Sequence, residues 1–302
     1  MASNDNYVLA RDLNGSLRLD CQHHLFRMYN GYVLHPTIPI QPDMKIAEIG
    51  TGTGIWLLEL APQLPSTVLL DGFDISDNLF PHQSLLPENL RFGVMDSFGD
   101  VPEDLIGKYD VVHLRLWCCV VTGGDPGKLI QGSMRLLKPG GYLQWDESDP
   151  RKPFDKGEHA EAFLPVALSI YKSFNVDFSA LMAFLLESSW IPELDKHAKK
   201  EGLDVVEFKK GVFPSSMLPL VTKTHLSAHA ELIDSAYIGQ SESLPPREGT
   251  EKSLFSLIEA TKEGAVYHWS PVMLLARKPT ALEEDGIWHA EAKDIVGSAA
   301  VT

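Results

Sequence analysis

The sequence has few of the residues that hold secreted proteins together or bind metals. It contains only three cysteines in 302 residues, namely Cys21, Cys118 and Cys119. Their spacing fits neither a disulfide framework nor a metal-binding motif, and an adjacent pair is poorly placed to bridge itself. We therefore expect a protein of a reducing compartment, with no structural disulfide and no bound metal.

Positive charge is also scarce. The chain has 26 Lys and Arg against 41 Asp and Glu, which gives a formal net charge of −15. Such a surface repels nucleic acids and acidic membranes. Neither is an expected partner, and a small-molecule substrate fits the composition better.

Long apolar runs are absent too. No stretch approaches the roughly 18 apolar residues of a membrane helix, and the polar start, Met1 to Asn6, lacks the basic and apolar pattern of a signal peptide. We find no internal repeat. These features favour a cytoplasmic protein.

Hydrophobic residues make up 44% of the chain, which is enough for a large core. Their pattern predicts alternating strands and helices, with five strands at Lys45–Ile49, Thr67–Phe73, Leu90–Met95, Tyr109–Leu114 and Tyr142–Trp145. Helices are expected at Ser16–Tyr32, Ile55–Ala61, Lys128–Leu137 and Leu218–Tyr237. This order indicates an α/β fold with a doubly wound, mostly parallel sheet, whose ligands bind at the carboxyl ends of the strands.

The pattern also suggests a division of the chain. Residues 1–40 read as an N-terminal helical arm, 41–150 as the nucleotide-binding core, and 151–195 as a helical cap. Residues 196–290 return to the core, with strands at Val205–Lys209 and Val266–Arg277 and a helical insertion at 213–265. Pro271 suggests a bulge or an edge in the last strand. Residues 291–302 read as a flexible tail.

The most informative segment begins in the first strand and ends in a helix. Gly50, Gly52 and Gly54 follow this strand directly, and each allows a tight turn or a close backbone approach that a Cβ would block. Glu48 ends the strand, where its carboxylate can accept from an amine or a hydroxyl. The spacing departs from the Gly-x-Gly-x-x-Gly of dinucleotide sites. The alternative is a purely structural strand-to-helix turn.

Acidic residues end the next two strands. Asp74 comes about 20 residues after Gly54, where a carboxylate can hold a ribose diol; Asp71 is a less well placed competitor. Asp96 can accept from an adenine amine, with Ile75 and Met95 as apolar walls for the ring. The alternative for either aspartate alone is a solvated turn residue. Together with the glycine turn they favour a nucleoside ligand.

Five segments then resemble the successive motifs of class I S-adenosylmethionine-dependent methyltransferases. They are Glu48 to Gly54, Asp71 to Ser76, Val94 to Ser97, Tyr109 to Arg115, and Leu136 to Leu143. Further features, Gln22-His-His24, His35-Pro36 and His113-Leu-Arg115, resemble the fungal branch of LaeA-like regulators and secondary-metabolite tailoring enzymes. The resemblance implies a Rossmann-like methyltransferase fold with a seven-stranded sheet, in which the last strand is antiparallel.

The resemblance also implies a cofactor, S-adenosyl-L-methionine, and the residues that hold it. Glu48 would lie near the methionine amine, and the backbone of Gly50, Thr51, Gly52 and Gly54 would line the aminoacyl and ribose parts. Asp74 would hold the ribose and Ile75 would pack on the adenine, whose edge Asp96 and Ser97 would bind beside Met95. Leu114 and Arg115 would border the methionine end.

Three residues are candidates for a catalytic base or an acceptor contact. His113 ends the fourth strand, His23 lies on the arm beside His24, and Glu147 ends the fifth strand with Trp145 and Asp146. Each has a structural alternative: a satisfied strand histidine, a solvent-facing helix histidine, and a cap or surface carboxylate.

The expected function is transfer of a methyl group to an oxygen or nitrogen of a small secondary-metabolite acceptor. Two alternatives stay open: a cofactor-dependent cyclisation or rearrangement, in which the sulfonium acts as a fixed charge, and a LaeA-like regulator acting through protein partners. The helices between Glu158 and Ser189 could bury a homodimer interface as well as a substrate.

Overall fold

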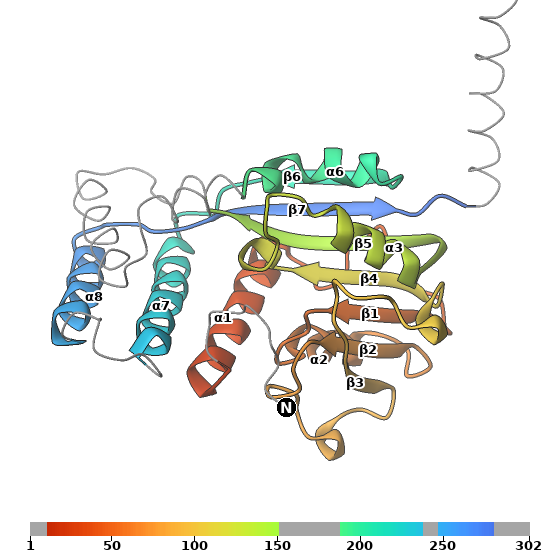
Figure 1. Cartoon of the computed structure of the whole chain (residues 1–302), viewed down its shortest axis with the longest axis horizontal. Helices are drawn as coiled ribbons and strands as arrows, with labels where there is room; N and C mark the ends of the chain where they lie inside the picture. The colour runs from red at the N-terminus through yellow and green to blue at the C-terminus, as the bar shows by residue number, and fades with distance from the viewer. Residues whose placement is uncertain (1–10, 151–187, 238–246, 281–302) are drawn as a thin grey trace, which may run out of the picture.

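The computed structural model describes residues 11–150, 188–237 and 247–280, and the rest of the chain is drawn in grey in Figure 1. Most of the expected cap, the Gly-Gln-Ser-Glu-Ser linker with Pro245 and Pro246, and the expected tail at 291–302 lie outside these residues. Within the described part, no helix is both long enough and apolar enough to cross a membrane.

A seven-stranded sheet forms the centre of the molecule, with strand order β3-β2-β1-β4-β5-β7-β6. The first five strands are parallel to one another, and β7 runs antiparallel to both β5 and β6. The strands are β1 (Lys45–Ile49), β2 (Leu69–Asp74), β3 (Leu90–Val94), β4 (Tyr109–Arg115), β5 (Leu137–Asp149), β6 (Asp204–Lys210) and β7 (Ser270–Arg277). This confirms the expected doubly wound α/β fold.

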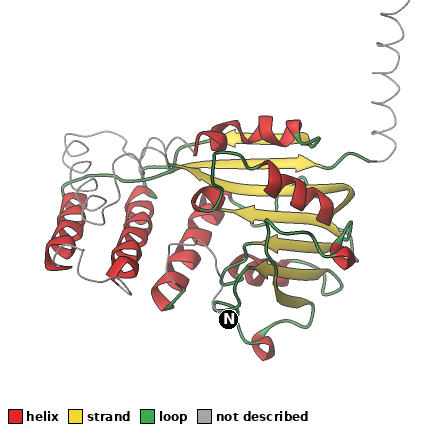
Figure 2. Cartoon of the chain, viewed as in Figure 1, coloured by secondary structure: helices red, strands yellow, loops and turns green. Residues whose placement is uncertain are grey.

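Helices lie on both faces and beyond the carboxyl ends of the parallel strands (Figures 1 and 2). They are α1 (Leu13–Asn30), α2 (Ile55–Leu60), α3 (Gly127–Leu136), α6 (Leu194–Lys200), α7 (Leu218–Tyr237) and α8 (Arg247–Lys262). Short 3-10 turns occur at Ala61–Gln63, Gln83–Leu85, Glu103–Leu105, Trp117–Cys119 and Ser188–Glu193. Helices α1, α7 and α8 stand side by side past the carboxyl edge, where a ligand of this fold binds.

Two apolar layers hold the sheet between its helices. On one face, Leu129 and Ile130 of α3 and Leu194 of α6 pack against inward residues of β4, β5 and β7. On the other face, Trp56 and Leu57 of α2 pack against β1, β2 and the segment before β1. Alternate residues along each strand therefore face different surroundings, and this decides which polar groups can meet.

Two expectations about the strands need correction. The turn expected at Lys138 to Gly141 lies within β5, where Gly140 adopts φ 80° and the register with β4 shifts between Tyr109 and Val111. The strand runs through the glycines as an irregularity instead of starting after them. Strand β7 is interior and not an edge, and Pro271 is tolerated because it is only the second residue of the strand.

Candidate active site

The glycine turn after β1 has the backbone conformation that its sequence predicts. Gly50, Gly52 and Gly54 have φ values of 70°, 56° and 75°, in the left-handed region that glycine tolerates best. A Cβ on Gly50 would lie 2.7 Å from the Trp117 ring, and one on Gly54 would lie 2.2 Å from the Phe92 ring. The turn therefore needs glycine for both its conformation and its close contacts.

Two carboxylates fix this turn from neighbouring strand ends. Asp74 accepts from the Gly52 N–H at 2.9 Å, and burial raises the pKa of this aspartate. Glu48, which is buried, accepts from the Thr51 hydroxyl at 2.7 Å. Both residues lie where the sequence predicted, at adjoining carboxyl ends of parallel strands.

The residues expected around an adenine ring are more spread out. Ile75 is 36% exposed just after β2, in a position open to a ligand. Asp96 is exposed and accepts from the Phe98 N–H at 2.9 Å, next to the half-buried Ser97. Met95 is 8% exposed and packs in the core, so its side chain offers little surface to a ligand.

His113 lies inside a buried polar network rather than at the surface of a cleft. Its ring stacks on Trp56 with a centroid distance of 3.9 Å. Nδ1 lies 3.1 Å from Glu48 and Nε2 lies 3.3 Å from Asp146, and the side chain is fully buried. Both ring nitrogens thus have carboxylate partners, so His113 connects Glu48 to Asp146.

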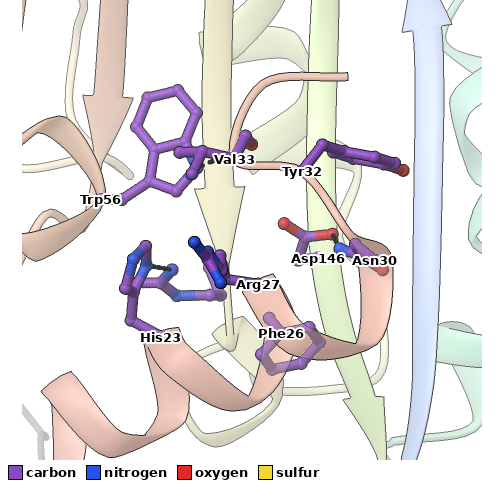
Figure 3. A pocket seen from close by; sticks show the side chains of 9 residues that line it. His23, Phe26, Arg27, Asn30, Tyr32, Val33, Trp56 and Asp146 are labelled. Atoms are coloured by element: carbon purple, nitrogen blue, oxygen red, sulfur yellow. Dashed lines mark hydrogen bonds between the residues drawn. The ribbon is translucent and has the colours of Figure 1, made fainter. Parts of the chain in front are cut away.

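His23 reaches the same face of the sheet from α1 (Figure 3). Arg115 donates to its Nδ1 at 2.8 Å, so Nε2 carries the proton and donates to Glu59 at 2.5 Å. Burial, reinforced by the charge of Arg115, lowers the pKa of His23 to about 4. His23 is therefore neutral at physiological pH and connects the arm to β4.

This arrangement argues against a metal ion at His23, His24 and Glu59, whose ligand atoms lie within 4.8 Å of one another. A metal needs the lone pair of His23 Nε2, but the hydrogen bond from Arg115 places the proton on that nitrogen. Arg27 also donates to Glu59 at 2.9 Å. Arg27 therefore already compensates the charge of Glu59 that a metal would neutralise.

Glu147 faces away from this network, into the opposite apolar layer. Its carboxylate accepts from the Trp117 N–H at 2.7 Å, the Trp145 indole at 3.2 Å and the Ser148 N–H at 2.9 Å. Complete burial raises its pKa to about 7. Through Trp117, Glu147 is hydrogen-bonded to the turn after β4, in which Leu116 adopts a φ of 58°.

Asp146 is the carboxylate of β5 that faces the site. It accepts from Asn30 at 2.9 Å and lies against His113. Together with Tyr32 and Arg115 it lines a narrow pocket under α1 (Figure 3). The alternation of side chains along a strand predicts that Asp146 faces the site. Asp146 pairs with Arg115, and Gln144, two residues earlier, pairs with His113, so their side chains lie on the same face of the sheet.

Leu114 and Arg115 show the same alternation at the end of β4. Leu114 is fully buried in the core, so only its backbone is available to a ligand. Arg115 points to the other face, toward His23. Of the predicted residues, the structure thus gathers Glu48, the glycines, Asp74 and Arg115 around one strand edge.

Comparison with known proteins agrees with this architecture. Residues 22–169 match a family model described as a methyltransferase domain. This part of the chain is therefore similar to a methyltransferase domain. The match begins in α1 and includes β1 to β5 and the glycine turn, so it covers the polar network described above.

Two fungal methyltransferases are similar to part of the chain. Methyltransferase grgD from a Penicillium species is 41% identical over 140 residues, which are 44% of this chain and 48% of that protein. N-methyltransferase tcpN from Claviceps purpurea is 32% identical over 135 residues, which are 44% of this chain and 48% of that protein. The chain thus matches about half the length of these curated relatives.

A solved structure similar to the chain is that of a putative sarcosine dimethylglycine methyltransferase from Galdieria sulphuraria. It is 18% identical, covers 91% of this chain and 94% of its own, and has a TM-score of 0.43.

Proposed function

We propose that the protein is an S-adenosylmethionine-dependent methyltransferase that methylates an oxygen or nitrogen of a small molecule. The observation that carries this proposal is the glycine turn of the methyltransferase domain, fixed by Asp74 and Glu48 at the carboxyl edge of the sheet. The methyltransferase names of its relatives support the same reaction.

The residues present fit the cofactor. The turn is a backbone cradle that a Cβ would fill, and the indole Nε1 of Trp117, which packs on Gly50, is buried with no hydrogen-bond partner among the described residues. We assign the ribose to Asp74, the adenine to Ile75, Asp96 and Ser97, and the aminoacyl part to Glu48 and the turn. When bound, the cofactor supplies a methyl group activated by its sulfonium.

The protein then has to align an acceptor and exclude water. Helix α1 serves the second purpose, since Leu19 lies over Gly52, where a Cβ would come within 3.1 Å of its Cδ1. Asp20 of the same helix accepts from the Thr53 hydroxyl at 2.7 Å. These two contacts fix helix α1 to the cofactor turn. Because the reaction depends mainly on alignment and exclusion of water, a buried residue such as Glu147 is not needed as a base.

The test is incubation of the purified protein with S-adenosylmethionine and a panel of hydroxyl and amine acceptors, followed by mass analysis. A gain of one methyl group, lost in Asp74→Ala, is expected. Rearranged acceptor with unconsumed cofactor would instead identify the cyclisation alternative. Absence of any product together with absence of cofactor binding would refute the proposed function.

A further inference from the structure

A buried chain of three polar side chains crosses the centre of the sheet. Glu48 lies on β1, His113 on the neighbouring β4, and Asp146 on β5, which is the next strand along. All three side chains are buried. His113 Nδ1 lies 3.1 Å from Glu48, and His113 Nε2 lies 3.3 Å from Asp146. The imidazole ring therefore bridges two carboxylates, with one nitrogen directed at each.

The number of protons in this chain follows from hydrogen-bond chemistry. An ionised carboxylate only accepts, and a neutral imidazole has one donor nitrogen and one acceptor nitrogen. A neutral His113 ring would therefore turn a bare nitrogen toward a carboxylate oxygen, and two lone pairs would face each other. Two hydrogen bonds form only when the three groups hold one proton more than a neutral ring and two carboxylates.

The surroundings favour the histidine ring as the place of this extra proton. The Thr51 hydroxyl donates to the second oxygen of Glu48 at 2.7 Å, and the Asn30 amide donates to the second oxygen of Asp146 at 2.9 Å. Hydrogen bonds to a carboxylate favour its charged form. The ring itself stacks on Trp56, with 3.9 Å between the centroids and 6° between the planes, and an indole face attracts a cation.

The charges around the ring are consistent with a cation there. The guanidinium of Arg115 is the neighbouring positive group, and its charge is stabilised by three carboxylates, those of Glu48, Asp146 and Asp20. With a protonated His113 ring, these five groups carry three negative charges and two positive ones. One negative charge is left over, which suits a ligand with a positive group.

Glu48 connects this chain to the glycine turn. A carboxylate has about four lone-pair sites, and the described contacts of Glu48 use one for Thr51 and one for His113. The remaining sites can accept from a ligand at the turn. Because a hydrogen bond holds each oxygen of Glu48 from a different side, the direction of these free sites is fixed before a ligand binds.

We propose that His113 is a doubly protonated positioning residue, which holds the Glu48 carboxylate in the orientation that binds the ammonium group of the methyl donor. This inference rests on the proposed function. It assigns His113 to the amino-acid part of the donor, whereas Asp74 belongs to the ribose. His113 is then a fixed cation and not the base of the reaction.

Long-range nitrogen–proton correlation NMR on the full chain, labelled with nitrogen-15 histidine, tests the protonation. The His113 signals are identified by through-space contacts with the Trp56 ring, so the measurement depends on no variant. At neutral pH both ring nitrogens should give the signals of N–H groups. One protonated and one bare nitrogen would overturn the inference.

Calorimetry with two ligands tests the positioning. S-adenosylhomocysteine carries the amino-acid part, whereas 5′-methylthioadenosine has the same nucleoside and a thioether without it. His113→Gln turns a carbonyl oxygen toward one carboxylate. It should weaken binding of S-adenosylhomocysteine at least about tenfold, a difference of about 1.4 kcal/mol, and should leave binding of 5′-methylthioadenosine within about twofold of wild type.

His35→Gln is the matched control. His35 is also buried, and its Nε2 lies 3.1 Å from a carboxylate, that of Glu207 on the edge strand β6. This variant should bind both ligands like wild type. A loss in His113→Gln that is equal for the two ligands, or no loss, would overturn the inference. Wild-type protein that binds neither ligand would instead refute the proposed function.

Discussion

Two buried groups should change the stability of the protein with pH in opposite directions, so that their effects nearly cancel in wild type. Glu147 has a pKa raised from 4.5 to about 7 by burial, whereas His23 has a pKa lowered from 6.5 to about 4, mainly by burial. Both side chains are fully buried in the folded chain. Each group therefore binds protons differently in the folded and unfolded states, and this difference changes stability with pH.

The signs follow from the direction of each shift. Between pH 4.5 and 7 the unfolded chain has lost the Glu147 proton that the folded chain keeps, so stability falls as pH rises. Between pH 6.5 and 4 the unfolded chain has gained a His23 proton that the folded chain refuses, so stability falls as pH falls. From pH 4.5 to 6.5 the two contributions oppose each other.

The magnitude comes from the width of this shared window. At about 1.4 kcal/mol per pH unit, each group changes the free energy of unfolding by about 3 kcal/mol between pH 4.5 and 6.5. The two changes nearly cancel in wild type. Relative to wild type, Glu147→Gln should gain about 3 kcal/mol over this interval as pH rises, and His23→Gln should lose about 3 kcal/mol.

Urea denaturation at pH 4.5, 5.5 and 6.5 measures these differences, since other titrating groups cancel when each variant is compared with wild type. His82→Gln, at an exposed position, controls for loss of a histidine outside the core. Stability profiles of Glu147→Gln and wild type that run parallel would refute the burial of this carboxylate against Trp117 and Trp145.

Two further substitutions test the packing around the site. Gly54→Ala should destabilise the fold by about 2–5 kcal/mol, because its backbone is left-handed and the added Cβ clashes with Phe92. Gly31→Ala, which has a similar φ but open space around it, should cost about 1–2 kcal/mol. Equal losses of stability in urea would contradict the contact with Phe92. Arg18→Met should cost about 3–5 kcal/mol by leaving Glu231 buried and unpaired, and Arg18→Met with Glu231→Leu should recover most of it; thermal unfolding that shows no recovery would count against the pair.

The sheet could be predicted well because its strands are short apolar runs between turn residues. Four of the five predicted parallel strands, those at Lys45, Thr67, Leu90 and Tyr109, begin within two residues of the observed positions. Prediction failed for β5, where Leu137 already pairs with Tyr109 of β4 before the Pro-Gly-Gly sequence, and the pairing with β4 and β7 resumes at Tyr142 after it. That support comes from distant residues and leaves no local signal.

The cofactor side of the site could also be predicted, since Glu48 and Asp74 belong to neighbouring strands that end at one edge. The acid–base side could not. Glu147 and Asp146 are adjacent in sequence, and only the packing of Trp145 into one layer decides which carboxylate faces the site. Likewise, the partners of His113 are 65 and 33 residues away, so its saturation by two carboxylates depends on the fold.

The central claim is that the glycine turn and Asp74 hold the methyl donor, and calorimetric titration with S-adenosylhomocysteine tests it most directly. Wild type should bind one equivalent with a dissociation constant in the micromolar range, about −8 kcal/mol, and Asp74→Ala should weaken binding by at least about tenfold. Wild-type protein that is folded but binds no S-adenosylhomocysteine, or Asp74→Ala that binds it as tightly as wild type, would contradict the account.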